Sequence, residues 1–185
     1  MQNFSTKINY LTKFTFLTTQ DKKTYSTLSE NSKNNDLYQV ISKDLKYKNK
    51  LKIGKITNKS HPAYNQFGLF TLNKLNKEEF IIDYIGVVSS KPSETSDYCL
   101  NFEQGLNIDA EFSGNEARYI NDFRGIEKKP NSYFKTYIDK SENNRVKIGV
   151  FTLSEIEKGS EILVSYGKSY WKSRGNGEQI DCTLA

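Results

Sequence analysis

The segment ARYINDFRG, residues 117–125, places charged and amide side chains among aromatic and aliphatic ones. Arg118, Asn121 and Asp122 each stand beside a large apolar or aromatic residue. A surface segment does not need those large residues, and an ordinary core segment does not tolerate three polar side chains without partners. The pattern therefore predicts that these polar groups lie inside the fold and meet hydrogen-bonding partners there.

Histidine and cysteine are scarce, which narrows the chemistry open to the chain. His61 is the only histidine, and Cys99 and Cys182 are the only cysteines. Two thiols cannot make a four-ligand zinc site. A serine or cysteine nucleophile with a histidine base would have to use His61, which precedes Pro62 in a polar turn and is a poor candidate. Nothing indicates a disulfide framework, so a reducing compartment is expected.

The excess of positive charge is confined to the first 50 residues. The chain has 27 Lys and Arg against 22 Asp and Glu, a net charge of +5, and residues 1–50 hold nine Lys and four acids. We expect residues 1–50 to form a polar basic N-terminal extension with marginal structure, and to make any weak contact with nucleic acid or chromatin. Within it, residues 10–19 suit a strand and residues 29–36 a solvated loop. No apolar run approaches the length of a membrane span.

From Leu51 onward the sequence predicts many short strands and few helices, which is typical of a single β-rich domain. The predicted strands are LKIGKI (51–56), QFGLFTL (66–72, as a turn or strand), EFIIDYIGVV (79–88), DYCLNF (97–102), LNIDA (106–110), NSYFKTYI (131–138), VKIGVFTL (146–153) and EILVSY (161–166). SGNEARYIND (113–122) suits a short helix, and SYWKSR (169–174) suits a helical turn.

Several of these pieces, in this order and spacing, resemble the SET domain of protein-lysine methyltransferases. The resemblance covers about Leu51 to Arg174 and is most specific in GNEARYIND and GSEILVSYG. It implies a mostly β fold with short helices, a SET-domain β-clip of small curved sheets whose C-terminal segment threads through a loop as a pseudoknot. It also predicts three parts: the extension over 1–50, the SET domain over 51–174 and a C-terminal tail over 175–185.

The resemblance implies a site for S-adenosyl-L-methionine, whose polar and charged groups would explain the interior polar residues of ARYINDF. Tyr166 is implied to be the catalytic tyrosine, with no metal required. The residues implied to bind the cofactor are Phe67, Gly68, Leu69, Tyr98, Arg118, Asn121, Asp122, Tyr170 and Trp171. The residues implied to line the substrate channel are Tyr84, Phe134 and Val164.

The implied reaction is an in-line attack of a neutral lysine amine on the methyl group of a sulfonium. Free lysine has a pKa near 10.4, so the amine must first lose a proton. A narrow apolar channel and the adjacent positive sulfonium both disfavour the ammonium form. Because Phe134 and Val164 carry no hydroxyl that could hold a water, we expect a product beyond monomethyl-lysine.

The sequence departs from the family pattern at specific places. Gln66 stands where a second glycine is usual, and Asp122 stands where a histidine is usual. A carboxylate at position 122 would have to be hydrogen-bonded or protonated. The loop from Asp122 to Pro130 is longer than usual, and no cysteine cluster follows Trp171 to form a zinc-bound lid.

These departures leave alternatives open. The chain could be a non-catalytic SET-fold module that binds a cofactor or peptide, or an unrelated β-rich binding domain. Individual residues also have structural interpretations: Arg118 could pair with Glu116 or Asp109, and Asn121 could cap a helix. Other candidates could simply pack, namely Tyr84, Tyr98, Tyr166 and Trp171. Phe134 and Val164 could likewise only fill the core, with Tyr133 or Tyr137 entering the channel instead. For the active enzyme we expect a monomer in nucleus or cytoplasm, without a membrane, that acts on a lysine-containing protein or peptide such as a histone.

Overall fold

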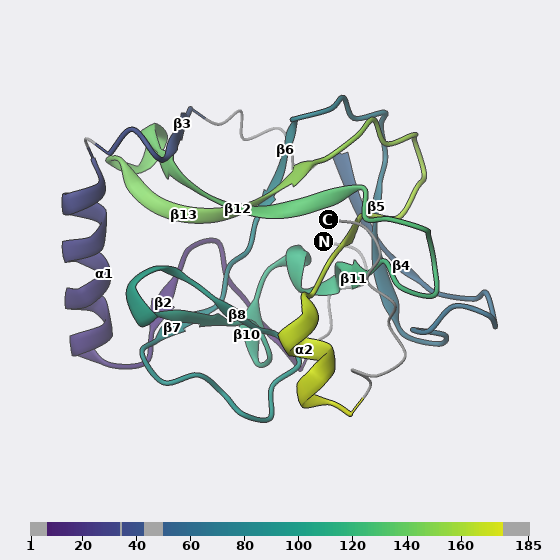
Figure 1. Cartoon of the computed structure of the whole chain (residues 1–185), viewed down its shortest axis with the longest axis horizontal. Coiled ribbons are helices and arrows are strands. Elements are labelled where there is room, and N and C mark those ends of the chain that lie inside the picture. Colours follow the sequence, from purple (N-terminus) through teal and green to yellow (C-terminus); the bar gives the residue numbers. More distant parts are fainter. Residues whose placement is uncertain (1–6, 34, 43–49, 176–185) are drawn as a thin grey trace.

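The structure is a computed structural model that describes residues 7–33, 35–42 and 50–175, and it shows small sheets with few helices (Figure 1). One four-stranded sheet has the order β3-β12-β13-β6. Its strands are β3 (Gln39–Ile41), β12 (Ser132–Asp139), β13 (Arg145–Thr152) and β6 (Phe80–Asp83). The predicted strands at 131–138 and 146–153 are confirmed as β12 and β13, which pair antiparallel along their whole length.

A second four-stranded sheet has the order β2-β7-β9-β8 and lies below the first in Figure 1. Its strands are β2 (Thr15–Phe16), β7 (Val87–Ser89), β9 (Asn107–Asp109) and β8 (Cys99–Asn101), with the short 3-10 turn η2 (Glu103–Gly105) joining the last two. The predicted pair of strands around Gly105 is therefore confirmed. EFIIDYIGVV, predicted as one strand, is instead two, because β6 joins the first sheet and β7 the second.

Three two-stranded pairs complete the sheet structure of the described residues. They are β1 (Asn9–Tyr10) with β10 (Ser113–Gly114), β4 (Leu51–Lys55) with β5 (Phe67–Thr71), and β11 (Asn121–Asp122) with β14 (Leu163–Val164). The predicted short helix at 113–122 is mostly extended. Only the 3-10 turn η3 (Glu116–Tyr119) is helical there, because residues on either side of it pair in the strands β10 and β11.

The C-terminal strand β14 is held on both sides, as the predicted pseudoknot requires. On one side it pairs in parallel with β11, and Phe123 N–H donates to the Val164 carbonyl. On the other side the Asn131 carboxamide accepts from Leu163 N–H at 2.9 Å and donates to the Glu161 carbonyl at 2.8 Å. Residues at both ends of the 123–131 connection thus hydrogen-bond to residues 161–164. The mostly β fold with short helices and small sheets that was expected from the sequence is confirmed.

The N-terminal segment differs from the expected extension with marginal structure. Residues 19–32 form α1 (Thr19–Ser32), which starts with a Thr18–Asp21 capping box. Tyr25 and Leu28 are buried in the main core, and the Tyr25 hydroxyl donates to the Val146 carbonyl of β13. The predicted strand at 10–19 is only the short β1 and β2, and the predicted loop at 29–36 is partly helix. The prediction failed because α1 packs through a few large side chains in a mostly polar sequence.

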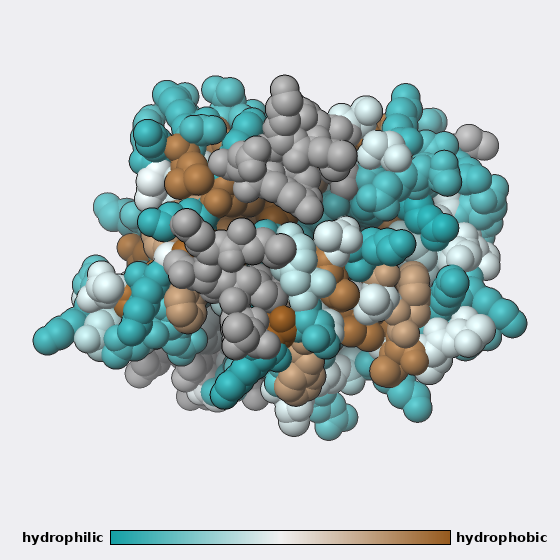
Figure 2. Space-filling view, turned by 180° about the vertical axis from the view of Figure 1, so that it is seen from behind, coloured by the Kyte–Doolittle hydropathy of each residue, from teal (hydrophilic) through white to brown (hydrophobic). Residues whose placement is uncertain are grey.

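The chain ends its described part with α2 (Lys168–Ser173), the helical turn predicted at 169–174. Gly167 starts it with φ of 87°, a left-handed conformation that favours glycine. Within the described ranges, no helix is both long and apolar enough to cross a membrane. Seen from behind, the molecule carries hydrophilic side chains over most of its rim, while hydrophobic ones show at the upper left and in the lower right part (Figure 2).

Candidate active site

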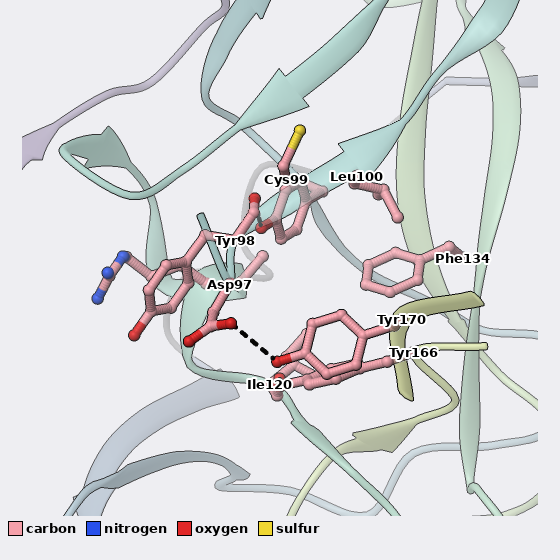
Figure 3. A pocket seen from close by; sticks show the side chains of 11 residues that line it. Asp97, Tyr98, Cys99, Leu100, Ile120, Phe134, Tyr166 and Tyr170 are labelled. Atoms are coloured by element: carbon pink, nitrogen blue, oxygen red, sulfur yellow. Dashed lines mark hydrogen bonds between the residues drawn. The ribbon is translucent and has the colours of Figure 1, made fainter. Parts of the chain in front are cut away.

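Two cavities meet between the second sheet, η3 and α2. The larger, here called the cleft, has a volume of about 750 Å³. The smaller, here called the channel, has a volume of about 50 Å³ and is shown in Figure 3. The residues that line both are Asp97, Tyr98, Arg118, Tyr166 and Tyr170. A ligand in the cleft and a side chain in the channel would therefore face each other across one shared wall.

Most of the candidate residues line one of these cavities. Those on the cleft are Phe67, Tyr98, Arg118, Asn121, Asp122, Tyr166, Tyr170 and Trp171. Those on the channel include Tyr84, Phe134 and Tyr166. Gly68, Leu69 and Val164 line neither cavity and are buried instead. Val164, expected in the channel, is a fully buried core residue, like its neighbour Leu163.

Two tyrosine hydroxyls are fixed at the channel by backbone carbonyls. Tyr166 donates to the Ile120 carbonyl at 2.6 Å, and Tyr84 donates to the Tyr98 carbonyl at 2.6 Å. Burial raises the pKa of both phenols above the ordinary value, so both stay protonated at neutral pH. With their hydrogens committed, each oxygen keeps lone pairs that can accept from an N–H group.

Away from Asp97 and Arg118, which it shares with the cleft, the channel is lined by aromatic and apolar side chains. Phe134 lies edge-on to the Tyr84 ring, with centroids 5.6 Å apart. Leu100, Ile120 and Cys99 complete that part of the wall (Figure 3). Burial raises the pKa of the Cys99 thiol, which disfavours a thiolate there. Such a lining suits the alkyl stem of a long side chain and disfavours a charged amine at its tip.

Asp122 is a buried carboxylate that accepts hydrogen bonds from several groups. It takes the Tyr166 backbone N–H at 2.7 Å and the Trp171 indole N–H at 3.2 Å. Arg124 donates to its two oxygens from Nη1 at 3.0 and 2.8 Å and to Oδ1 from its backbone N–H at 2.9 Å. The expectation that a carboxylate here must be hydrogen-bonded or protonated is therefore met by hydrogen bonds. One side chain thus ties Tyr166 to Trp171.

Arg118 is buried but pairs with neither Glu116 nor Asp109. Its Nε donates to the Ala110 carbonyl at 2.9 Å and its Nη2 to the Glu111 carbonyl at 3.3 Å. Its guanidinium lies 4.1 Å from the centroid of the Tyr98 ring. These contacts hold a full positive charge against the wall of the cleft, where an anionic group of a ligand could pair with it.

The helix α2 is tied to the loop before β8. Arg174 pairs with Asp97 at 2.5 Å and donates to the Ser96 carbonyl at 3.2 Å. Its guanidinium also lies 3.8 Å from the centroid of Tyr170, whose hydroxyl donates to Asp97 (Figure 3). Tyr170 and Trp171 are thereby held beside Tyr166, with ring centroids 4.8 and 6.5 Å from its own.

Sequence reasoning missed several residues on the cleft. His61, rejected as a nucleophile partner, lines it together with Lys7 from the N-terminal segment and Arg124. The signal for Arg124 was available, since a cation two residues after a buried Asp122 is an obvious partner. Lys7 gave no local signal, because its place depends on β1 pairing with β10 more than 100 residues later.

Comparison with known proteins places this site in a family. The SET domain family matches residues 66–167, more than half of the chain. Histone-lysine N-methyltransferase MEDEA of Arabidopsis thaliana is 29% identical over 110 residues, which are 54% of this chain and 15% of that protein. Putative histone-lysine N-methyltransferase ASHH4 of Arabidopsis thaliana is 30% identical over 112 residues, 54% of this chain and 30% of that protein. The chain spans less than a third of the length of these relatives.

Solved structures agree on the fold. Polycomb Repressive Complex 2 of Chaetomium thermophilum superposes with a TM-score of 0.51 at 21% identity, covering 68% of this chain and 17% of that one. A second structure of this complex, bound to S-adenosylmethionine, gives 0.50 at 23% identity, covering 64% and 15%. The fold defines a protein of the β-clip class. The chain belongs to the SET domain family, whose relatives named above are histone-lysine methyltransferases.

Proposed function

We propose that this chain transfers a methyl group from S-adenosyl-L-methionine to a lysine side chain of a protein. The observation that carries the proposal is the meeting of the cleft and the channel at Tyr166, Tyr98 and Arg118. A transfer between two large substrates needs two binding spaces that adjoin, and these two cavities share five lining residues. The polar residues of the cleft and the apolar lining of the channel also match a charged nucleoside and a lysine stem.

The cleft fits the cofactor in size and in chemistry. Its volume of about 750 Å³ lies within the usual range of ligand pockets. Trp171 and Phe67 offer flat faces for an adenine, and Arg118 offers a cation for a carboxylate. When bound, the cofactor supplies a methyl group activated by a positive sulfonium. The lining therefore supports the prediction that the candidate residues on the cleft bind the cofactor.

The residues of the chain would orient the amine and keep water away. The Tyr166 and Tyr84 oxygens can accept N–H groups of a neutral lysine amine, which aims its lone pair along the channel. Phe134 and Leu100 exclude water and favour the neutral amine. Placing the two reactants in line can lower the barrier by roughly 7–11 kcal/mol at the limit.

The substrate is proposed to be a lysine-containing segment of a histone or another protein. The named relatives are histone-lysine methyltransferases, which favours a nuclear, chromatin-associated role over a cytoplasmic one. The basic residues of 1–50 could add a weak contact with nucleic acid. The enzyme is proposed to act as a monomer. Among the described residues, no group of three or more His, Cys, Asp or Glu is placed to hold a metal ion.

The alternative, a SET-fold module without catalysis, was kept open by Gln66 and Asp122. The saturated hydrogen bonding of Asp122 weakens that alternative, since the substituted carboxylate is accommodated without displacing Tyr166. Calorimetric titration with S-adenosylmethionine and with its demethylated product tests the cofactor site. Turnover on a lysine-peptide array then separates enzyme from module: binding without any methylated peptide would favour the module.

A further inference from the structure

His61, the single histidine, is buried on the wall of the cleft and has a defined hydrogen-bonding state. Its side chain is 7% exposed. Its Nδ1 lies 3.0 Å from the Ala63 backbone N–H, which can only donate. Nδ1 must therefore accept, and the ring proton lies on Nε2. Nε2 is 3.0 Å from Glu161 Oε2, so the imidazole donates to this carboxylate.

The same carboxylate holds Asn121. Glu161 Oε1 accepts from Asn121 Nδ2 at 2.7 Å, and Nδ2 also donates to the Phe67 carbonyl at 3.3 Å. Both partners are pure acceptors, which fixes the orientation of the carboxamide. Both hydrogens of the amide are used, while Oδ1 accepts no hydrogen bond from the described residues. Because Asn121 lines the cleft, this oxygen is the acceptor that it can offer to a ligand.

The Glu161 carboxylate adds negative charge behind that acceptor. Its side chain is 10% exposed, and within the described part of the chain no Lys or Arg lies within ion-pair distance of it. Gly68 makes room for it, because a Cβ at this glycine would come within 2.5 Å of Glu161 Oε1. A Cβ at position 68 would therefore press on this carboxylate, which is a structural reason for a glycine there.

We propose that His61 is a positioning residue which, through Glu161, sets the Asn121 carboxamide to receive a cationic hydrogen-bond donor. The inference rests on the proposed function. Of the groups on S-adenosylmethionine, the ammonium of the amino-acid end combines positive charge with N–H donors, and it is the group that an oxygen backed by a carboxylate favours. In this role His61 acts through Glu161 and Asn121, and not through a contact of its own with the reacting atoms.

Two substitutions at one position separate this role from a merely structural one. An amide nitrogen or oxygen in asparagine reaches about as far as Nδ1 of histidine, and in glutamine about as far as Nε2. H61N therefore keeps an acceptor for Ala63 N–H but loses the hydrogen bond to Glu161. H61Q keeps the donor to Glu161 but loses the hydrogen bond from Ala63 N–H. If His61 only stabilises the turn, H61N is the benign variant. If His61 positions Asn121, H61Q is the benign variant.

Binding is measured by the fluorescence of Trp171, the only tryptophan, which lines the cleft. The probes are S-adenosylhomocysteine, which carries the ammonium, and 5′-methylthioadenosine, which lacks the amino-acid end. We expect H61N to weaken the affinity for S-adenosylhomocysteine about tenfold, which corresponds to the loss of one charge-assisted hydrogen bond. The affinity for 5′-methylthioadenosine should change by less than about twofold. H61Q should bind both probes within about threefold of the wild type.

The outcomes distinguish the two proposals. Equal weakening of both probes by H61N, or no weakening of S-adenosylhomocysteine, would overturn the role of His61 while leaving the proposed function intact. A wild-type chain that binds neither probe would refute the proposed function and this inference with it. Should H61N fail to fold, Glu161→Gln carries the same test, because His61 and Asn121 donate to different oxygens of Glu161 and a glutamine keeps an oxygen at only one of these two positions. It should show the same selective loss.

Discussion

Asp122→Asn removes one negative charge from the centre of the site while changing the shape of the side chain very little. In the wild type, the carboxylate is 5% exposed and accepts from Arg124, from the Tyr166 backbone and from the Trp171 indole. An asparagine has one acceptor oxygen, and its NH₂ group would face donors. The substitution therefore leaves Arg124 without its ion partner and at least one donor unsatisfied.

The cost can be worked out from the exposure of the pair. Breaking a buried ion pair by removing one partner costs about 3–5 kcal/mol. The Arg124 side chain keeps 17% of its surface exposed and lies 3.4 Å from the Ser165 hydroxyl, so some compensation is available. We expect a loss near the lower limit, about 3 kcal/mol. For a chain of this length that corresponds to a fall in Tm of roughly 6–12 °C.

Urea denaturation followed by Trp171 fluorescence measures this loss. The exposed Asp36 provides the matched control, since Asp36→Asn makes the same chemical change without a buried partner. In a double-mutant cycle, Arg124→Gln should recover part of the loss, with a coupling energy above about 1 kcal/mol. An Asp122→Asn variant within about 1 kcal/mol of the wild type, or a coupling near zero, would refute the view that the ion pair with Arg124 stabilises the buried carboxylate.

Three further predictions concern the core, the channel and pH. Leu28→Ala should destabilise the protein by about 2–5 kcal/mol in urea denaturation, because Leu28 is 1% exposed, whereas Leu37→Ala, at an 88% exposed residue, should stay within about 0.5 kcal/mol. A marginally structured N-terminal segment would make both values small. Mass spectrometry should show product beyond monomethyl-lysine, and Phe134→Tyr should restrict it; monomethyl product alone after long incubation with excess cofactor would contradict this. The raised pKa values of Tyr84 and Tyr166 mean that the folded state retains protons which the unfolded state loses, so the free energy of unfolding should fall as pH rises above about 10. Unfolding midpoints in urea measured from neutral to alkaline pH check this, and a midpoint that rises there would contradict it.

The central part of the chain was predictable because its signals are local. Alternating apolar residues fixed β12 and β13, and the Gly105 turn fixed β8 and β9. The resemblance located the candidate residues on the cleft and the channel, since the motifs that carry it are short and rich in polar and aromatic residues. The resemblance pointed to Tyr166, which lines both cavities. Its hydrogen bond to the Ile120 carbonyl could not be predicted from the sequence.

The rest depended on contacts between distant segments. The N-terminal segment looked polar because its helix buries only a few residues, and the strand β13 that it covers lies more than 100 residues away. His61 and Glu161 are likewise 100 residues apart, so neither predicted the other. Val164 was misplaced because both residues of β14 are buried in the core, which the sequence of this short strand did not show. Burial and register of this kind arise only in the folded chain.

The most direct test of the account compares methyl transfer and cofactor binding in the wild type and in Tyr166→Phe. The substitution removes only the hydroxyl that faces the channel, while the contacts of the cleft remain. With isotopically labelled S-adenosylmethionine and a lysine-peptide array, we expect the wild type to label peptides and Tyr166→Phe to lose most of that activity. Its calorimetric affinity for the cofactor should stay nearly unchanged. Wild-type turnover in Tyr166→Phe, or no labelling by a wild type that binds the cofactor, would contradict the account.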